Sequence, residues 1–140
     1  MNKLPNKPSA LIRVALTDIE LCRKDPKYDL DMNDWHRPGI DKICYVCLAG
    51  SVMAKTLKSI YDARFEPSRF DHETGNKLLA IDLFRLGEIV SGLEYFFNFE
   101  RDVDELERCG LKEPRYRKTK QGYSPAYLNR LADEFERCGL

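Results

Sequence analysis

The feature that most constrains this chain is a long apolar stripe with helical spacing in its middle. Along it, apolar residues recur at alternating steps of four and three, which places them on one face of an α-helix. The stripe consists of Leu79, Leu83, Leu86, Val90, Leu93 and Phe97. A second stripe, made of Leu78, Ile81 and Phe84, widens the apolar face. A helix this apolar is expected at the centre of a domain, with neighbours on more than one side.

Start and stop signals outline the helices of the first two thirds of the chain. Ser9 is a candidate N-cap for a first helix, which Asp25-Pro26 ends. A second helix is expected from about Cys44 to Lys58, with small residues in its second turn that would let another helix approach closely. Asp71 can cap the helix that carries the long stripe, and Gly87 predicts a kink or break in it.

Two further helices are expected in the last third. Asp102 and Glu105 form a capping box before a short helix, and Ser124-Pro125 is a typical helix start. Both helices end in nearly the same sequence, DELERCGL over residues 104–111 and DEFERCGL over residues 133–140. The glycine of each copy suits the left-handed position of a Schellman end. The repeat therefore indicates two similar helix ends or, as an alternative, a duplicated interaction motif.

These elements predict an all-α fold. The chain has 140 residues, of which 43% are hydrophobic, and that is enough for one core. We expect a single compact helical domain over residues 1–140 with about five to six helices. Tyr28, Leu30 and Met32 alternate with acidic residues, so one short extended segment is expected near residues 28–32. The remaining connections are expected to be loops.

Charge and hydropathy argue against several classes of protein. The chain has 23 basic and 23 acidic residues, and this balance does not suit a surface built as a whole for nucleic acid or an anionic membrane. It has no apolar run of membrane-spanning length and no signal peptide at its start, so a cytoplasmic location is expected. In that compartment its five cysteines are expected to be free thiols: Cys22, Cys44, Cys47, Cys109 and Cys138.

The pair Cys44-x-x-Cys47, with His36 before it, is a candidate site for metal or nucleophilic chemistry. A structural zinc site needs about four ligands, and no further cysteine or histidine stands at a familiar spacing. A cysteine at a helix start could instead be a nucleophile, with His36 or His72 as its base. The interpretation we favour is two buried thiols, with His36 hydrogen-bonded and no metal, cofactor or catalytic residue.

The segment from residue 112 to residue 123 interleaves cations with aromatic rings. Cations beside stackable rings suit a phosphate backbone or an unstacked base. The residues concerned are Arg115, Tyr116, Arg117, Lys118, Lys120 and Tyr123. The alternative is a purely structural role, in which this segment is a basic linker that pairs with the acidic helix before it. Nucleic-acid or nucleotide binding is therefore a second hypothesis for the function of the chain.

Trp35-His36 and the run Cys44-Tyr-Val-Cys47-Leu-Ala-Gly50-Ser-Val-Met-Ala54 resemble a family of small uncharacterised bacteriophage and prophage proteins. Proteins of that family carry a W-H pair, a loop, and then C-x-V-C-L-A-G followed by a small residue and V-M-A. The segment from Asn76 to Arg85 is similar as well. The resemblance implies a phage or prophage origin and action in the cytoplasm. It carries no catalytic residues over to this chain.

Together these observations predict a non-enzymatic phage accessory protein that binds and modulates a host or phage protein, in host takeover or host defence. It is expected to work as a homodimer or with a host partner. Its candidate partner-binding residues are Trp35 and His36, with the cations and tyrosines of residues 115–123 named above. The alternatives are a nucleic-acid or nucleotide binder and a cysteine-centred enzyme or zinc protein.

Overall fold

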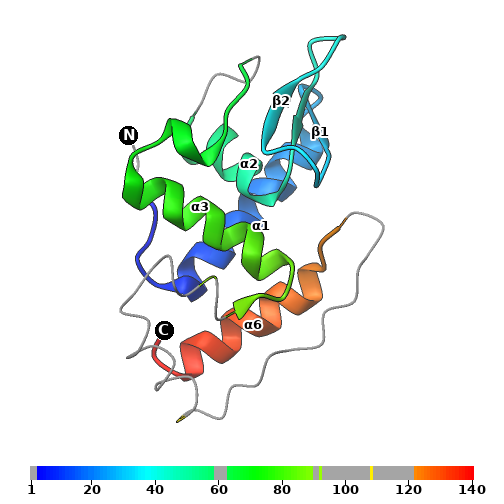
Figure 1. The fold of residues 1–140 in the computed structure, drawn as a ribbon. Helices are drawn as coiled ribbons and strands as arrows, with labels where there is room; N and C mark the ends of the chain where they lie inside the picture. The colour runs from blue at the N-terminus through cyan, green and yellow to red at the C-terminus, as the bar shows by residue number, and fades with distance from the viewer. Residues whose placement is uncertain (1–2, 59–62, 90–91, 93–107, 109–121) are drawn as a thin grey trace.

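The computed structural model of the chain describes residues 3–58, 63–89, 92, 108 and 122–140. In these ranges four α-helices accompany a small three-stranded sheet, with the sheet at one end and α6 at the other (Figure 1). The fold is therefore mixed α/β, and the prediction of an all-α domain with five or six helices is wrong. Each strand is only three residues long, and only the one at Tyr28–Leu30 has an alternation in the sequence that predicts it.

The first helix, α1 (Pro8–Lys24), packs along one side of the core, against α2 (Leu48–Ala54) and α6 (Pro125–Arg137). It ends before Asp25-Pro26 as predicted, but its N-cap is Lys7 and not Ser9. Pro8 occupies the first turn, where its missing N–H costs nothing. Ser9 lies inside the helix, and its hydroxyl donates to the carbonyl of Leu140 at 2.7 Å.

The sheet has the order β1 (Tyr28–Leu30), β3 (Cys44–Val46), β2 (His36–Pro38), with β1 parallel and β2 antiparallel to β3. The extended segment predicted near residues 28–32 is confirmed as β1. The helix predicted from Cys44 begins only at Leu48, because the residues before it form the central strand. Cys44 and Val46 are buried while Tyr45 is partly exposed, which is the alternation of a strand.

Local capping chemistry was predicted correctly at both remaining helices. In α3 (His72–Arg85), Asp71 accepts a hydrogen bond from the backbone N–H of Thr74 at 2.9 Å, and the predicted break follows at Gly87, whose φ is 82°. Ser124 caps α6, which ends in the predicted Schellman geometry, with the N–H of Leu140 donating to the carbonyl of Phe135 at 2.8 Å. The helix predicted after Asp102, with the first DELERCGL copy, lies outside the described residues apart from Arg108.

The structure buries the second apolar stripe of α3 more deeply than the first, the opposite of what the sequence predicts. The second stripe, Leu78, Ile81 and Phe84, is fully buried, and Phe84 packs edge-on against Phe135 of α6. The first stripe is only half-buried at Leu79, Leu83 and Leu86. Its continuation at Val90, Leu93 and Phe97 lies outside the described residues.

Two buried cations explain this reversal. Lys77 and Arg85 lie on the inward side of α3, where hydrophobicity alone would not place them. The Lys77 ammonium donates to the carbonyl of Leu4 at 3.0 Å, to Asn6 Oδ1 at 2.8 Å and to Glu73 Oε1 at 2.9 Å. The Arg85 guanidinium donates to Asp82 and to the carbonyl of Gly122, both at 2.8 Å. Burial is tolerated because the donors find acceptors.

None of the helices in the described part of the chain is long and apolar enough to cross a membrane.

Gly50 gives a direct test of this packing. A Cβ added to Gly50 would overlap the carbonyl oxygen of Trp35, which is backbone and cannot swing aside. We expect Gly50→Ala to lower the free energy of unfolding by about 3 kcal/mol or more, although alanine normally favours a helix over glycine. Urea unfolding followed by circular dichroism measures this loss of stability, with Thr17→Ala on the exposed side of α1 as the control. A stable Gly50→Ala variant would contradict the packing.

Candidate functional site

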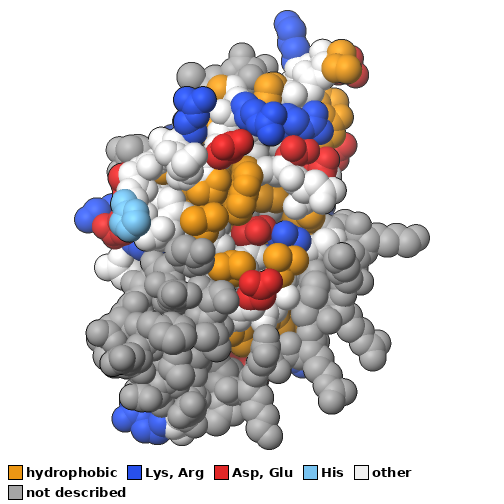
Figure 2. All heavy atoms as spheres, in the orientation of Figure 1, with side chains coloured by type: hydrophobic (Ala, Val, Ile, Leu, Met, Phe, Trp, Pro, Cys, Tyr) orange, Lys and Arg blue, Asp and Glu red, His pale blue; other side chains and the backbone are white. Residues whose placement is uncertain are grey.

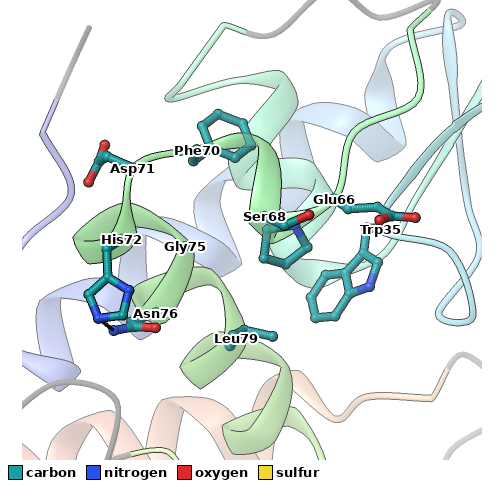
Figure 3. Close-up of a pocket in the computed structure, with 10 residues that line it drawn as sticks. Trp35, Glu66, Ser68, Phe70, Asp71, His72, Gly75, Asn76 and Leu79 are labelled. Atoms are coloured by element: carbon teal, nitrogen blue, oxygen red, sulfur yellow. Dashed lines mark hydrogen bonds between the residues drawn. The ribbon is translucent and has the colours of Figure 1, made fainter.

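A cavity of about 510 Å³ opens between Trp35, the short 3-10 turn η1 (Pro67–Arg69) and the first half of α3 (Figure 3). Its apolar lining comes from three separate parts of the chain, the residue before β2, the turn and the helix. The lining residues include Trp35, Pro67, Phe70, Gly75 and Leu79. The polar residues at the cavity are Glu66, Ser68, Asp71, His72 and Asn76. The lining is therefore mixed, with apolar and polar residues in similar number; we call the polar ones the rim.

Close backbone contacts hold the two walls of the cavity. The carbonyl of Trp35 accepts a hydrogen bond from the N–H of Cys47 at 3.4 Å, so the start of α2 fixes where Trp35 lies. On the other side, a Cβ on Gly75 would come within 2.8 Å of the Pro67 carbonyl, so only glycine lets η1 lie this close to α3. The indole of Trp35 lies across the open space from Leu79 (Figure 3).

The polar groups at the rim are engaged in local structure. The carboxylate of Asp71 accepts from both the N–H and the hydroxyl of Thr74, and these bonds hold the pKa of Asp71 below its usual value. Nε2 of His72 lies 3.2 Å from the side-chain amide of Asn76, the contact drawn as a dashed line in Figure 3. Glu66 lies 3.8 Å from Arg64 at the surface. The described rim therefore offers hydrogen bonding and charge to a ligand.

An apolar strip continues from the cavity along α3. We define the α3 strip as Leu79, Leu83 and Leu86, all half-buried. Residues four apart on a helix lie one above the other, so Leu79 and Leu83 form one ridge. Figure 2 shows hydrophobic side chains gathered down the middle of this face, with both acidic and basic side chains among them. Cavity and strip thus form one apolar surface.

His36 lies behind the cavity and not in it. Its side chain is 1% exposed, and its ring packs edge-on against Phe65 with centroids 5.5 Å apart. Nδ1 donates to the carbonyl of Ala63 at 2.7 Å, which confirms that His36 is hydrogen-bonded. Burial lowers the pKa of His36, so the neutral ring is favoured. Its carbonyl also accepts from the N–H of Phe65, so His36 anchors the segment that leads into η1.

The cysteines are placed for packing. Cys22, Cys44, Cys47 and Cys138 are buried thiols that form no disulfide. Cys44 Sγ lies 3.4 Å from Nδ1 of His36, whereas Cys47 Sγ accepts from the N–H of Gly50 at 3.3 Å, so the two sulfurs serve different neighbours. Burial raises the pKa of Cys47 to about 12 and that of Cys22 to about 11. Within the described ranges no group of three or more His, Cys, Asp or Glu residues could hold a metal ion.

The structure describes three of the predicted partner-binding residues, Trp35, His36 and Tyr123. Trp35 lines the cavity and His36 supports it from behind. Tyr123 is 2% exposed, and its hydroxyl accepts from Arg23, so its ring is not available for stacking in this conformation. The others, Arg115, Tyr116, Arg117, Lys118 and Lys120, lie outside the described residues. The opposite wall, η1 and Phe70, belongs to a connection that the sequence predicts only as a loop.

Thiol reactivity tests the placement of the cysteines. We expect Cys22, Cys44, Cys47 and Cys138 to alkylate on the order of a hundredfold more slowly in the native protein than in urea, because reaction needs local opening. Iodoacetamide labelling resolved by peptide mass spectrometry gives each rate separately. Rapid native labelling of Cys44 would instead identify an activated thiol beside His36.

The buried imidazole predicts a pH dependence of stability. The folded pKa of His36 is lowered from its ordinary 6.5, so the unfolded chain binds the proton first as the pH falls. The free energy of unfolding should therefore decline below about pH 6.5. Urea unfolding at several pH values should show that decline weakened in His36→Asn, which keeps a donor near Ala63. His72→Asn removes the exposed histidine and is the control; equal slopes in both variants would refute a role for His36.

No family model, curated protein or solved structure matches this chain. What it does is therefore inferred from its own geometry.

Proposed function

We propose that this chain is a non-enzymatic binding protein that docks a segment of another protein in the cavity beside Trp35 and along the α3 strip. The observation that carries the proposal is the continuous apolar surface formed by the cavity and the strip. The cavity, with a volume of about 510 Å³, is large enough for an anchoring side chain of the partner and the residues next to it. Half-buried apolar side chains gathered on one face are typical of interaction surfaces.

The open shape of the surface favours a protein segment over a small enclosed ligand. The strip runs away from the cavity along α3, and such a length of apolar surface suits side chains spaced along a chain. Trp35 supports this reading, because tryptophan is enriched at interface hot spots, with an apolar body and a polar edge. The described thiols are buried away from the cavity, and Asp71 is used as a helix cap.

The resemblance to phage and prophage proteins extends the proposal to a setting. Its three segments are Trp35-His36, the run from Cys44 to Ala54, and the segment from Asn76 to Arg85. Trp35 lines the cavity, Gly50 lies against the Trp35 backbone, and the third segment includes most of α3. We propose a phage-encoded protein that acts in the cytoplasm of its host on a host or phage protein. A second copy of the chain is the homodimeric form of the same proposal.

Crosslinking from the strip tests this function. A photoreactive amino acid in place of Leu79, in the host that expresses the protein, should give a covalent adduct with one protein species, identified by mass spectrometry. The same residue in place of Leu21, which is 48% exposed on α1, is the control and should give none. Adducts of equal yield from both positions, or none from position 79, would refute the docking surface.

Substitution then measures the contribution of the strip. Burying one leucine side chain contributes about 1.5–3 kcal/mol, so Leu79→Ser should weaken the affinity for the crosslinked partner by roughly ten- to a hundredfold. Leu21→Ser should leave the affinity unchanged. Trp35 is the only tryptophan, so its fluorescence reports on the cavity during the titration.

A further inference from the structure

The charges of α3 are sorted between the inside and the outside of the molecule. From Asp71 to Glu88 the chain has two Lys or Arg residues, and both are buried. The side chains of Lys77 and Arg85 are 7% and 10% exposed. As described above, Lys77 donates its hydrogen bonds to Leu4, Asn6 and Glu73. Arg85 donates to Asp82 and Gly122. Neither cation projects toward a partner.

The acidic side chains of the same segment remain at the surface. Asp71 and Glu88 are exposed, and the side chain of Glu73 is 57% exposed although it pairs with Lys77. Asp82 is more covered, because it receives Arg85. The hydrogen bond from Lys77 lowers the pKa of Glu73, which keeps that carboxylate ionised at neutral pH. The outer side of α3 is therefore acidic, although the whole chain has no net charge.

Basic side chains lie instead in η1 and just before it. Arg64 and Arg69 are exposed there, and Figure 2 shows Lys and Arg side chains gathered at that end of the face. Between Leu79 and Glu88 the acidic residues are Asp82, which pairs with Arg85, and Glu88, which is exposed. The exposed carboxylate nearest to the strip in sequence is thus Glu88, whereas exposed arginines lie at η1.

The spacing of the strip indicates the shape of the occupant. Leu79, Leu83 and Leu86 follow steps of four and three along one helix, a ridge that packs against the grooves of a second helix. Seven residues of α-helix span about 10 Å, which two turns of a partner helix would cover. Lysine and arginine side chains can lay their aliphatic stems on leucine while their charges reach nearby carboxylates.

From this arrangement we infer that the docking segment of the partner is a basic amphipathic helix, with one large apolar side chain in the cavity and cations beside Asp82 and Glu88. This inference rests on the proposed function and specifies its partner. Apolar contacts supply most of the affinity in such a complex, and the charges of the rim set its specificity and its dependence on salt.

Selection from a displayed peptide library tests the charge of the occupant. The library contains helix-forming peptides of about sixteen residues, roughly four turns, with leucine or phenylalanine at helical spacing and random flanking residues. Selection is made on the full chain, with counter-selection on Leu79→Ser. We expect the enriched peptides to be strongly basic, and to shift the fluorescence of Trp35.

Matched charge variants sharpen the readout for the best peptide. Its affinity should fall about three- to tenfold in Glu88→Lys, and by a similar factor as the ionic strength rises from about 0.05 to 0.3 M. Glu20→Lys, a reversal at an exposed position of α1, is the control and should leave the affinity nearly unchanged.

Each other outcome overturns the inference in a recognisable way. Neutral or acidic peptides that still lose binding in Leu79→Ser would refute the basic partner and leave the docking surface standing. Enrichment of no peptide would refute a helical occupant, and the crosslinks from position 79 would then decide the proposed function separately. Peptides that bind Leu79→Ser and the unaltered chain equally would refute docking on the strip.

Discussion

Gly50, in the buried helix α2, lies against the backbone of Trp35. This close contact fixes the position of Trp35, and with it one wall of the surface cavity. All seven residues of α2 are buried, and the helix packs between α1, α3 and the sheet. Its N-terminal turn receives the Trp35 carbonyl at a position where any side chain would overlap it. Trp35 is thus set by the best-packed element of the fold, and its indole reaches the cavity from a rigid base. Such preorganisation lowers the entropy lost when a partner binds.

The interior behind the cavity is polar as well as apolar. His36 joins β2 to the segment before η1 through two hydrogen bonds, one from its ring to Ala63 and one from the N–H of Phe65 to its carbonyl. On the opposite side, Lys77 joins α3 to the residues before α1. These buried groups cost desolvation, which their hydrogen bonds offset. They fix where the walls lie more strictly than apolar packing alone would.

The sequence predicted the features that depend on residues close together in the chain, such as the helix ends. It missed those that depend on residues far apart, such as strand pairing and the buried face of α3. Asp71, Ser124 and Gly139 act on backbone groups within a few residues, so the helix ends they mark were predictable. The strand at Cys44–Val46 depends on pairing with Tyr28–Leu30 and His36–Pro38, and its apolar residues also fit a helix. The inward face of α3 depends on acceptors at Leu4 and Gly122, which no local pattern reveals. For the same reason Trp35 was predicted as a binding residue, while the wall at Pro67 and Phe70 was not.

The packing of α1 against α6 has a consequence for folding during synthesis on the ribosome. Arg13 reaches Asp133 across 120 positions of sequence, and Ser9 reaches Leu140 across 131. The inner face of α1 leaves the exit tunnel long before α6, the helix that covers it. Native contacts this distant in sequence form slowly. Leu11, Ile12 and their apolar neighbours therefore stay without this cover until α6 has been made, and exposed apolar surface of this kind is what chaperones protect in a nascent chain.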